Sequence, residues 1–373
     1  MNLQRGVILF SGFNQRAVFS FIRTLESCHV PYAVIAKSKK DTIFDSIYKR
    51  AVLVIRNNEN LVLADILRCI DVVKDKMRLV DYLLAPTSEG LNRFFLLYRI
   101  QFESKNVIIP LVNISLYEKI SDKYSFSLLC RKYNIKIPEE YINLTNVNIP
   151  FVAKPKKYFN EEGESLSPVL ILNEQDLTDF RIKYKVDDFY YQTFISGESF
   201  YLLYYIDKDG QILKFSQQNI AQQPCGKSIL AAIPANLHHE SISLLYEKLL
   251  KAENFHGFIM IEVKKNGNEY FMIEANPRFW GPSQLFVDAG RNFFEIFLSD
   301  YDLLDKHKEF RLNIKNVKYF WYGGILQTLR EKKNIVYHVS SMDIQKNISD
   351  WLFYDIYMRE DTLSIFKNEL SYD

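Results

Sequence analysis

Short apolar runs alternate with amphipathic segments over the first part of the chain. Four apolar runs predict buried strands: residues 7–10, 32–36, 51–55 and 82–85. Two segments between them have helical spacing: residues 17–27 and 61–74. Strands that alternate with helices predict a doubly wound α/β domain built on a parallel sheet. The loop after the first run has one glycine, Gly12, so it lacks the G-x-G-x-x-G pattern of dinucleotide sites, which argues against a nicotinamide oxidoreductase.

The fourth apolar run ends in a polar segment, residues 86–89. Ligands of open α/β sheets bind beyond the carboxyl ends of the strands, so this segment is a candidate for ligand contact. Thr87 or Ser88 can instead cap the helix predicted over residues 90–102. The two roles are compatible, because a capping side chain can also face a ligand.

The pattern changes near residue 120, where a helix is predicted over residues 121–133. Strands then dominate, at residues 151–155, 189–195, 200–206 and 211–220, followed by a helix over residues 240–251. After about residue 300 the pattern weakens, with one helix predicted over residues 325–332. We interpret this tail as a packing appendage or a dimer contact, and it shows no motif that indicates chemistry.

The most informative stretch, residues 257–276, predicts two strands joined by a tight turn. Alternation places Glu274 and Asn276 on one face of the second strand, and Glu262 lies within the first. Two carboxylates and an amide are hard oxygen donors, which suit a Mg²⁺ ion that bridges substrate phosphates. The plain alternative is a half-exposed strand whose polar side faces water.

The turn decides whether these oxygen ligands share a face. A two-residue turn at Asn266-Gly267 sets Glu262 opposite Phe271, on the wrong face for Glu274. A three-residue loop with a glycine bulge sets Glu262 opposite Met272, with Glu274 as its diagonal neighbour about 7–8 Å away. We predict the bulged loop, because it gathers all three ligands on one face.

Composition narrows the class of protein without defining it. The chain has 373 residues, 48% hydrophobic and 25% charged, with a formal net charge of +2. This length allows two or three domains, and the near-neutral charge gives no argument for nucleic acid or a membrane surface as partner. The four cysteines are scattered without metal spacing and are expected to be reduced thiols. No apolar run reaches the roughly 18–20 residues of a membrane span, so a cytoplasmic location is expected.

Two further features indicate binding of an anionic nucleotide. Lys154 stands in an apolar strand, where a lysine either extends to water at a strand end or holds an anion. Lys123 begins a helix, where a cation is unfavourable unless an anion lies nearby. Residues 192–198 form a strand that breaks at a glycine turn, which exposes backbone groups to a flat base and sets a carboxylate nearby.

Taken in order, these motifs resemble those of one superfamily. They are Asp122-Lys123, Lys154-Pro155, Gln192 to Ile195 with Gly197-Glu198, Gly257 to Glu262, and Ile273 to Arg278. In this order they resemble the ATP-grasp superfamily, nearest to its carbamoyl-phosphate-synthase-like and carboxylate–amine ligase branch. The resemblance spans about residues 1–300, and its Glu-x-Asn-Pro-Arg end is the most specific part.

The resemblance implies ATP as substrate and assigns its contacts by motif position. Lys123 and Lys154 would contact the nucleotide phosphates. Gln192 and Ile195 would bind adenine, largely through backbone groups, and Glu198 would bind the ribose.

The same resemblance implies a metal site and a catalytic pair. Glu262, Glu274 and Asn276 would hold Mg²⁺, or Mn²⁺ in its place. Arg278 would steady the transferred phosphoryl group, and Lys154 would act with it. One feature departs from the family: the flap after Lys154, residues 156–165, has a single glycine and three acidic residues instead of a glycine-rich loop.

We therefore expect three regions: an N-terminal α/β domain (1–115), an ATP-grasp domain (116–300) with a small lobe (121–195) and a larger lobe (196–300), and an appendage (301–373). The expected activity is that of a ligase that converts a carboxylate into an acyl phosphate and joins it to an amine. The expected substrate class is an amino acid, a peptide or an amino-acid-modified sugar acid. The substrate pocket is expected between the carboxyl edge of the first sheet and residues 279–284.

The alternative is an ATP-binding module without turnover. The expected partners are the small-molecule substrates and a second copy of the chain.

Overall fold

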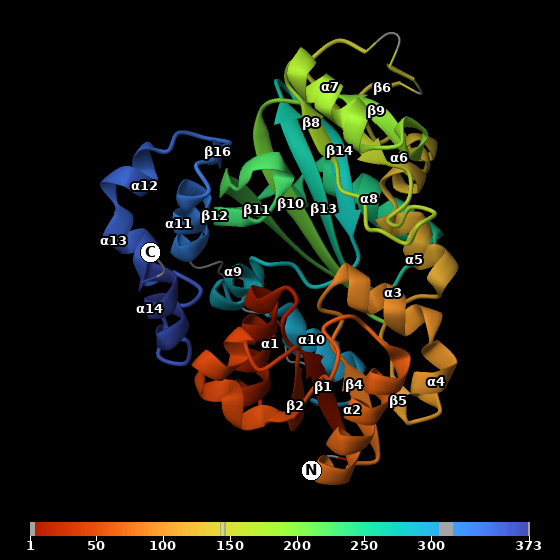
Figure 1. Ribbon diagram of the computed structural model, residues 1–373, viewed down its shortest axis with the longest axis vertical. Helices are drawn as coiled ribbons and strands as arrows, with labels where there is room; N and C mark the ends of the chain where they lie inside the picture. The colour runs from red at the N-terminus through yellow and green to blue at the C-terminus, as the bar shows by residue number, and fades with distance from the viewer. Residues whose placement is uncertain (1–3, 142, 145–146, 306–315, 372–373) are drawn as a thin grey trace.

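Three β-sheets organise the chain in the computed structural model, which describes residues 4–141, 143–144, 147–305 and 316–371. The N-terminal sheet and the largest sheet lie one below the other in Figure 1, and the smallest sheet lies at the upper right. The C-terminal segments, drawn in blue, lie along the left side of the largest sheet. The outcome is the mixed α/β architecture that the pattern of apolar runs predicts.

The N-terminal sheet is parallel, in the order β3-β2-β1-β4-β5. Its strands are β1 (Arg5–Phe10), β2 (Tyr32–Ala36), β3 (Val52–Ile55), β4 (Asp81–Leu84) and β5 (Val107–Ile108). Its helices are α1 (Gln15–Ser27), α2 (Leu63–Met77), α3 (Glu89–Leu97) and α4 (Arg99–Glu103). The strand order reverses between β1 and β4, so the carboxyl ends of these two strands open a crevice for ligands. Ser88 caps α3 by accepting a hydrogen bond from the backbone N–H of Leu91.

The smallest sheet is antiparallel, in the order β6-β9-β7-β8. Its strands are β6 (Glu140–Tyr141), β7 (Phe151–Pro155), β8 (Val169–Ile171) and β9 (Phe189–Thr193). The helix α7 (Glu174–Lys183) packs on this sheet, and the helices α5 (Ile114–Ser121) and α6 (Lys123–Lys132) precede it in the chain. Phe151, Ala153 and Tyr191 pack into a core on one face. Because side chains alternate along a strand, Lys154 and Gln192 point from the other face.

The largest sheet has the order β14-β13-β10-β11-β12-β15, and β16 pairs with β11. Its strands are β10 (Glu198–Ile206), β11 (Ile212–Gln222), β12 (Ile229–Ala235), β13 (Gly257–Asn266), β14 (Glu269–Asn276), β15 (Tyr319–Phe320) and β16 (Val336–Tyr337). Three helices follow its strands: α8 (Ser241–Ala252), α9 (Ser283–Asp288) and α10 (Phe293–Asp300). The face that includes Leu202 and Ile261 packs with α5, α6 and α8. The face that includes Leu203 and Met260 packs toward α1, α9 and α10.

An aromatic cluster joins the N-terminal domain to this second face. The ring centroid of Phe21, on α1, lies 5.1 Å from that of Phe279 and 4.9 Å from that of Phe294. Phe258, on β13, lies 4.8 Å from Phe279. Each buried phenylalanine contributes about 1.5–3 kcal/mol through removal from water. The cluster therefore fixes the crevice of the N-terminal sheet against the large sheet.

The turn between β13 and β14 differs from the predicted bulged loop. Asn266 pairs with Glu269, so the turn has two residues, Gly267 and Asn268. The bulge lies inside β14, at Ile273, between the Val263–Met272 and Glu262–Glu274 pairs. The predicted diagonal pairing was therefore wrong, because Glu262 and Glu274 lie directly opposite one another. The predicted shared face is present. The two-residue turn alone would place Ile273 opposite Glu262, and the one extra residue in β14 places Glu274 there instead.

The C-terminal tail is part of the large sheet, which goes beyond the packing appendage or dimer contact that its sequence indicated. β15 pairs with β12 and β16 pairs with β11. Its helices are α11 (Tyr322–Arg330), α12 (Met342–Lys346), α13 (Ile348–Phe353) and α14 (Leu363–Ser371). Two-residue strands carry too little alternation to be seen in a sequence, which is why they were not predicted.

Gly197 allows β10 to begin close against β13. Its φ is +123°, and a Cβ atom there would lie 2.1 Å from the carbonyl oxygen of Lys265. We expect Gly197→Ala to lower the free energy of unfolding by about 2–4 kcal/mol, because it adds a backbone clash to an unfavourable φ. The matched control is Gly210→Ala, where φ is +79° and nothing lies within 4 Å of the added atom. That variant should lose only about 1 kcal/mol in urea unfolding; equal losses in the two variants would contradict the close approach.

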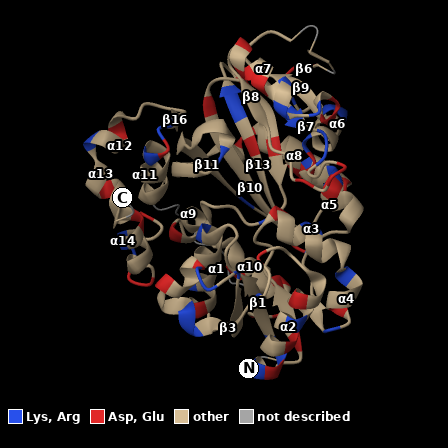
Figure 2. Ribbon diagram, viewed as in Figure 1, with Lys and Arg blue, Asp and Glu red and all other residues tan. Residues whose placement is uncertain are grey.

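Charge and hydropathy add two observations. Basic and acidic residues are interspersed over all parts of the chain in Figure 2, in keeping with the net charge of +2. Among the described residues, no helix has the length and apolar character that crossing a membrane requires.

Candidate active site

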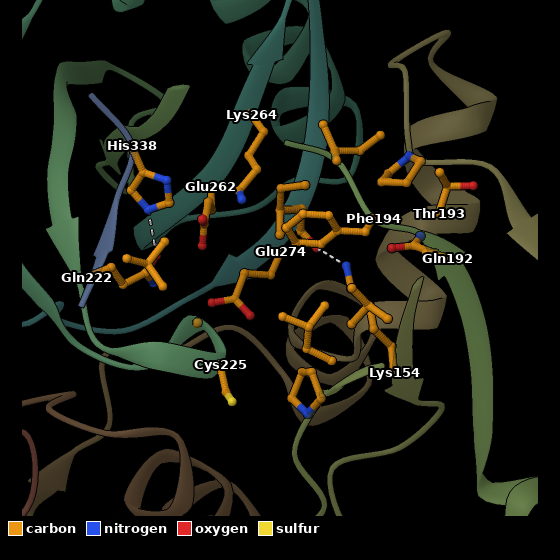
Figure 3. Close-up of a pocket in the computed structure, with 18 residues that line it drawn as sticks. Lys154, Gln192, Thr193, Phe194, Gln222, Cys225, Glu262, Lys264, Glu274 and His338 are labelled. Atoms are coloured by element: carbon orange, nitrogen blue, oxygen red, sulfur yellow. Dashed lines mark hydrogen bonds between the residues drawn. The ribbon is translucent and has the colours of Figure 1, made fainter. Parts of the chain in front are cut away.

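Two cavities meet on the inner side of the large sheet. The first has a volume of about 200 Å³ and lies between the small sheet and the strands β13 and β14. Figure 3 shows it from within, with Lys154 on one side and Glu262 and Glu274 on the other. Much of its wall is apolar, including Val152, Leu170 and Phe194. This shape and lining suit a flat base at one end and charged groups at the other.

Lys154 reaches from the small sheet to the bulge of the large sheet. Its Nζ donates a hydrogen bond of 2.7 Å to the carbonyl oxygen of Ile273, the bulged residue. The side chain is only 5% exposed. Burial, together with the charge of Lys123, lowers the pKa of Lys154 to about 7, although Glu274 and Glu262 oppose this shift. An ammonium held this far from water is ready to bind an anion.

Glu262 and Glu274 form a carboxylate pair at the end of the same cavity. Ser199 Oγ donates to Glu262 at 3.2 Å, and Asn276 Nδ2 donates to Glu274 at 2.8 Å. Burial and the neighbouring Glu274 raise the pKa of Glu262. Burial alone would raise the pKa of Glu274 too, but the Lys123 ammonium, which forms an ion pair with it, and the Asn276 amide lower it. Like charges placed side by side in a buried site indicate a cation or proton as their shared partner.

A chain of buried polar side chains positions this pair from across the sheet. Gln217 Nε2 donates to Asn219 Oδ1 at 2.7 Å, and Asn219 Nδ2 donates to Ser199 Oγ at 2.9 Å. Ser199 in turn donates to Glu262. These residues were not predicted as site residues. Their only signal in the sequence was a run of four polar residues, 216–219, inside a predicted strand.

The second cavity, of about 750 Å³, lies beyond Glu274, which lines both cavities. Its walls come from the ends of β1 and β4, from residues 280–282, and from the C-terminal tail. Asn276 and Arg278 line it, and the Arg278 guanidinium donates to the backbone oxygen of Phe279 at 3.0 Å. The crevice of the N-terminal sheet and the loop after β14, which were expected to form a substrate pocket, therefore lie on the same cavity.

Besides Lys154, four residues were expected to bind the nucleotide, and only two of them, Gln192 and Ile195, line the first cavity. The Gln192 side chain donates to Glu140 at 2.8 Å. Lys123 approaches the site through its ion pair with Glu274 instead of lining the cavity. The Glu198 side chain points away from the first cavity. It accepts a hydrogen bond from Gln218 at 2.8 Å, and it lies on the opposite face of β10 from its neighbour Ser199, which contacts Glu262. The expected ribose contact by Glu198 does not agree with this geometry.

The flap after Lys154 turns its charged residues outward. Phe159 pairs with Ser165 across the flap, and Glu161 forms an ion pair with Lys185 at 3.0 Å. Tyr158 faces inward, where it lines the second cavity, and Arg93 lies 4.9 Å from its ring centroid. The flap thus covers the second cavity with an aromatic side chain.

The C-terminal tail contributes to both cavities, which the sequence did not predict. His338 lines the first cavity, and its Nε2 lies 2.9 Å from Gln222 Oε1, as Figure 3 shows. Burial lowers the pKa of His338 to about 4, so the ring is neutral at pH 7. Trp321 and Tyr357 line the second cavity. A weak pattern of apolar positions gave no signal for any of these contacts.

Comparison with solved structures identifies the fold. The biotin carboxylase domain of 2-oxoglutarate carboxylase from Hydrogenobacter thermophilus, in complex with MgADP, ADP and bicarbonate, aligns with a TM-score of 0.62 and 11% identity over 83% of this chain and 72% of that one. An N5-carboxyaminoimidazole ribonucleotide synthetase, PurK, in its ADP complex aligns with a TM-score of 0.60 and 14% identity over 88% of this chain and 84% of that one. Pyruvate carboxylase from Rhizobium etli aligns with a TM-score of 0.60 and 12% identity over 80% of this chain, which spans 28% of that enzyme.

These alignments establish that the chain has an ATP-grasp fold, the fold that the resemblance implied. No protein-family model and no curated protein matches the sequence. At 11–14% identity the solved structures define the fold alone, and the activity must be argued from the site.

Proposed function

We propose that the protein is an ATP- and Mg²⁺-dependent ligase that activates a carboxylate as an acyl phosphate and joins it to an amine. The observation that carries this proposal is the position of Glu274, which lines both cavities. A nucleotide in the first cavity would place its terminal phosphate where the second cavity begins. The ADP and MgADP complexes of the compared enzymes support a nucleotide in the first cavity.

The first cavity supplies the groups that a nucleotide needs. Backbone groups of Phe194 and Ile195, just after β9 ends its pairing at Thr193, are available to the edge of adenine, and Val152 and Leu170 provide apolar surface for its faces. Lys154 would bind a phosphate, which gives its buried ammonium a counter-charge. Lys123 would exchange its ion pair with Glu274 for a phosphate contact.

The donor set at the junction fits Mg²⁺, or Mn²⁺ in its place. Glu262, Glu274 and the Asn276 amide oxygen provide hard oxygen ligands on two paired strands. Within the described residues, no group of three or more His, Cys, Asp or Glu side chains gathers as a metal cage. The protein would therefore supply part of the coordination shell and leave places for phosphate oxygens and water. When bound, the metal neutralises negative charge on the transferred phosphoryl group.

The second cavity supplies the groups for the acceptor. A carboxylate oxygen would attack the γ-phosphorus of ATP, forming an acyl phosphate as the bond to ADP breaks. The amine nitrogen would then attack the acyl carbon, and phosphate would leave. Arg278 would hold the carboxylate and then the acyl phosphate by bidentate hydrogen bonds. Tyr158 on the flap would exclude water, which otherwise hydrolyses the acyl phosphate.

The proposal predicts ADP release that depends on both a carboxylate and an amine. A panel of acids, each labelled with ¹⁸O in the carboxylate, is incubated with ATP, Mg²⁺ and a panel of amines, and ADP and phosphate are analysed by mass spectrometry. We expect one ¹⁸O atom to pass from the acid to the released phosphate. ADP formation without transfer of ¹⁸O would contradict carboxylate activation. Stabilisation of the fold by ATP and Mg²⁺ with no ADP from any pair would instead support a binding module without turnover.

A further inference from the structure

The charges that line the second cavity do not balance. Both of its acidic residues are neutralised: Glu89 pairs with Arg93 at 2.7 Å, and Glu274 pairs with Lys123. Its basic residues, Arg16, Lys227 and Arg278, have no carboxylate within ion-pair distance among the described residues. A cavity with unpaired positive charge and paired negative charge is suited to a ligand with more than one negative group.

Arg16 is held in place at the wall opposite the junction. It lies in the first turn of α1, and its guanidinium carbon lies 3.8 Å from the ring centroid of Trp321. Its Nη2 donates to Ser228 Oγ at 2.7 Å, and its Nη1 donates to the backbone oxygen of Ile229 at 3.4 Å. These bonds use two of the five N–H groups of a guanidinium, so donors are left for a ligand. No acidic residue occupies the first turn of α1, so the positive end of the helix dipole adds to this charge.

Trp321 is fixed as the platform beneath Arg16. Its backbone N–H donates to Leu230 at 2.8 Å, and its indole Nε1 donates to Glu369 Oε1 at 3.1 Å. Two glycines make room for this arrangement. A Cβ at Gly323 would lie 1.9 Å from Glu369, and a Cβ at Gly324 would lie 2.3 Å from the Trp321 ring. The tail therefore builds a rigid support for one guanidinium of the N-terminal domain.

We propose that Arg16 recognises a second anionic group on the carboxylate substrate. The substrate would be a dicarboxylate or a phosphate-bearing acid, with one carboxylate at Arg278 and the other anionic group at Arg16. Aromatic side chains that line the same cavity, including Tyr201, Trp280 and Tyr357, favour an apolar or flat framework. Arg16 thus determines which acid binds, and Trp321 and Glu369 are positioning residues. This inference rests on the proposed function only in naming the acid as the activated substrate.

The test measures binding without ATP, so it is independent of turnover. Dianionic probes are isophthalate, succinate and phosphonoacetate, and their monoanionic counterparts are benzoate and butyrate. Binding is followed by tryptophan fluorescence, because Trp321 lies against Arg16, and by the shift in melting temperature. We expect at least one dianion to bind the wild-type protein about tenfold or more tighter than its monoanionic counterpart. Preference for phosphonoacetate over succinate would indicate a phosphate-bearing acid, and the reverse preference would indicate a dicarboxylate.

Arg16→Met should bring the dianion to the affinity of the monoanion, with the monoanion itself little changed. Arg16→Lys keeps the charge but loses the planar contact, so an intermediate loss is expected. Lys40→Met removes one exposed positive charge elsewhere in the N-terminal domain and should leave the preference intact. The inference is overturned if no dianion is preferred by the wild-type protein, or if Arg16→Met keeps the preference. Absence of ADP release with the preference intact would overturn the proposed ligase activity and leave the anion site standing.

Discussion

Replacing Glu274 with glutamine is expected to lower ADP formation by about 10³-fold or more, equivalent to about 4 kcal/mol of transition-state stabilisation. Glu274 faces Glu262 directly and lines both cavities, so its carboxylate would serve the metal and the phosphates at once. The amide keeps the size of the side chain and its bond to Asn276, but it loses the negative charge. The measurement is the rate of ADP release at saturating ATP and Mg²⁺ with the best acid and amine from the panel.

The matched control for that variant is Glu198→Gln. Glu198 lies on the neighbouring part of the same sheet, but it contacts Gln218 and points from the other face. We expect its rate and its KM for ATP to stay within about twofold of the wild-type values, because surface substitutions of this kind rarely perturb a site. A Glu274→Gln variant with full activity would refute the metal assignment. A large loss of ADP release in Glu198→Gln would instead support the ribose contact that the geometry disfavours.

The second large effect concerns Lys154, where function and stability are expected to change in opposite directions. Lys154→Met should reduce ADP formation by about 10²–10³-fold, because a buried phosphate would lose its counter-charge. The same change should raise the free energy of unfolding at pH 7 by about 1–3 kcal/mol, since a charged group that is 5% exposed is replaced by an apolar one of similar length. The lost hydrogen bond to Ile273 limits this gain.

The sign of the pH dependence follows from the lowered pKa. Lys154 titrates near pH 7 in the folded protein, against about 10.4 in the unfolded chain. Between these values the unfolded state binds more protons, so the cost of burying Lys154 is full below pH 7 and fades as pH rises toward 10. The stability gain of Lys154→Met in urea unfolding should therefore shrink between pH 7 and pH 10. Lys49→Met, which removes an exposed lysine, should show no such change; an equal stabilisation at both pH values would contradict the account.

The sequence predicted which site residues share a face of the sheet better than it predicted the pairing register of β13 and β14. Alternation alone placed Glu274 and Asn276 together, and Lys154 stood out because it interrupts an apolar strand. The bulge at Ile273 could not be predicted, because its carbonyl is stabilised by Lys154 from another sheet, 119 residues away in the chain. The bulged loop was predicted because it gathered the three ligands on one face, but the extra residue lies inside β14, where Lys154 contacts it.

The expected ribose contact of Glu198 and the overlooked contacts of the tail differ from the structure for similar physical reasons. Glu198 was assigned to the ribose by its motif position beyond a glycine turn, whereas the alternation of side chains along β10 decides which face it takes. The tail was overlooked because its two-residue strands and short helices carry no periodic signal. Trp321 and His338 reach the cavities only through pairing with β12 and β11, which lie about 100 residues earlier in the chain.

The most direct test of the site is the position of a Mn²⁺ ion in crystals grown with ADP. Anomalous scattering locates the metal without assuming its ligands. We expect a peak within coordination distance, about 2.0–2.3 Å, of Glu262 and Glu274 oxygens, with Lys154 against the nucleotide phosphates. A nucleotide-bound Mn²⁺ elsewhere, with Lys123 still paired to Glu274, would contradict this expectation.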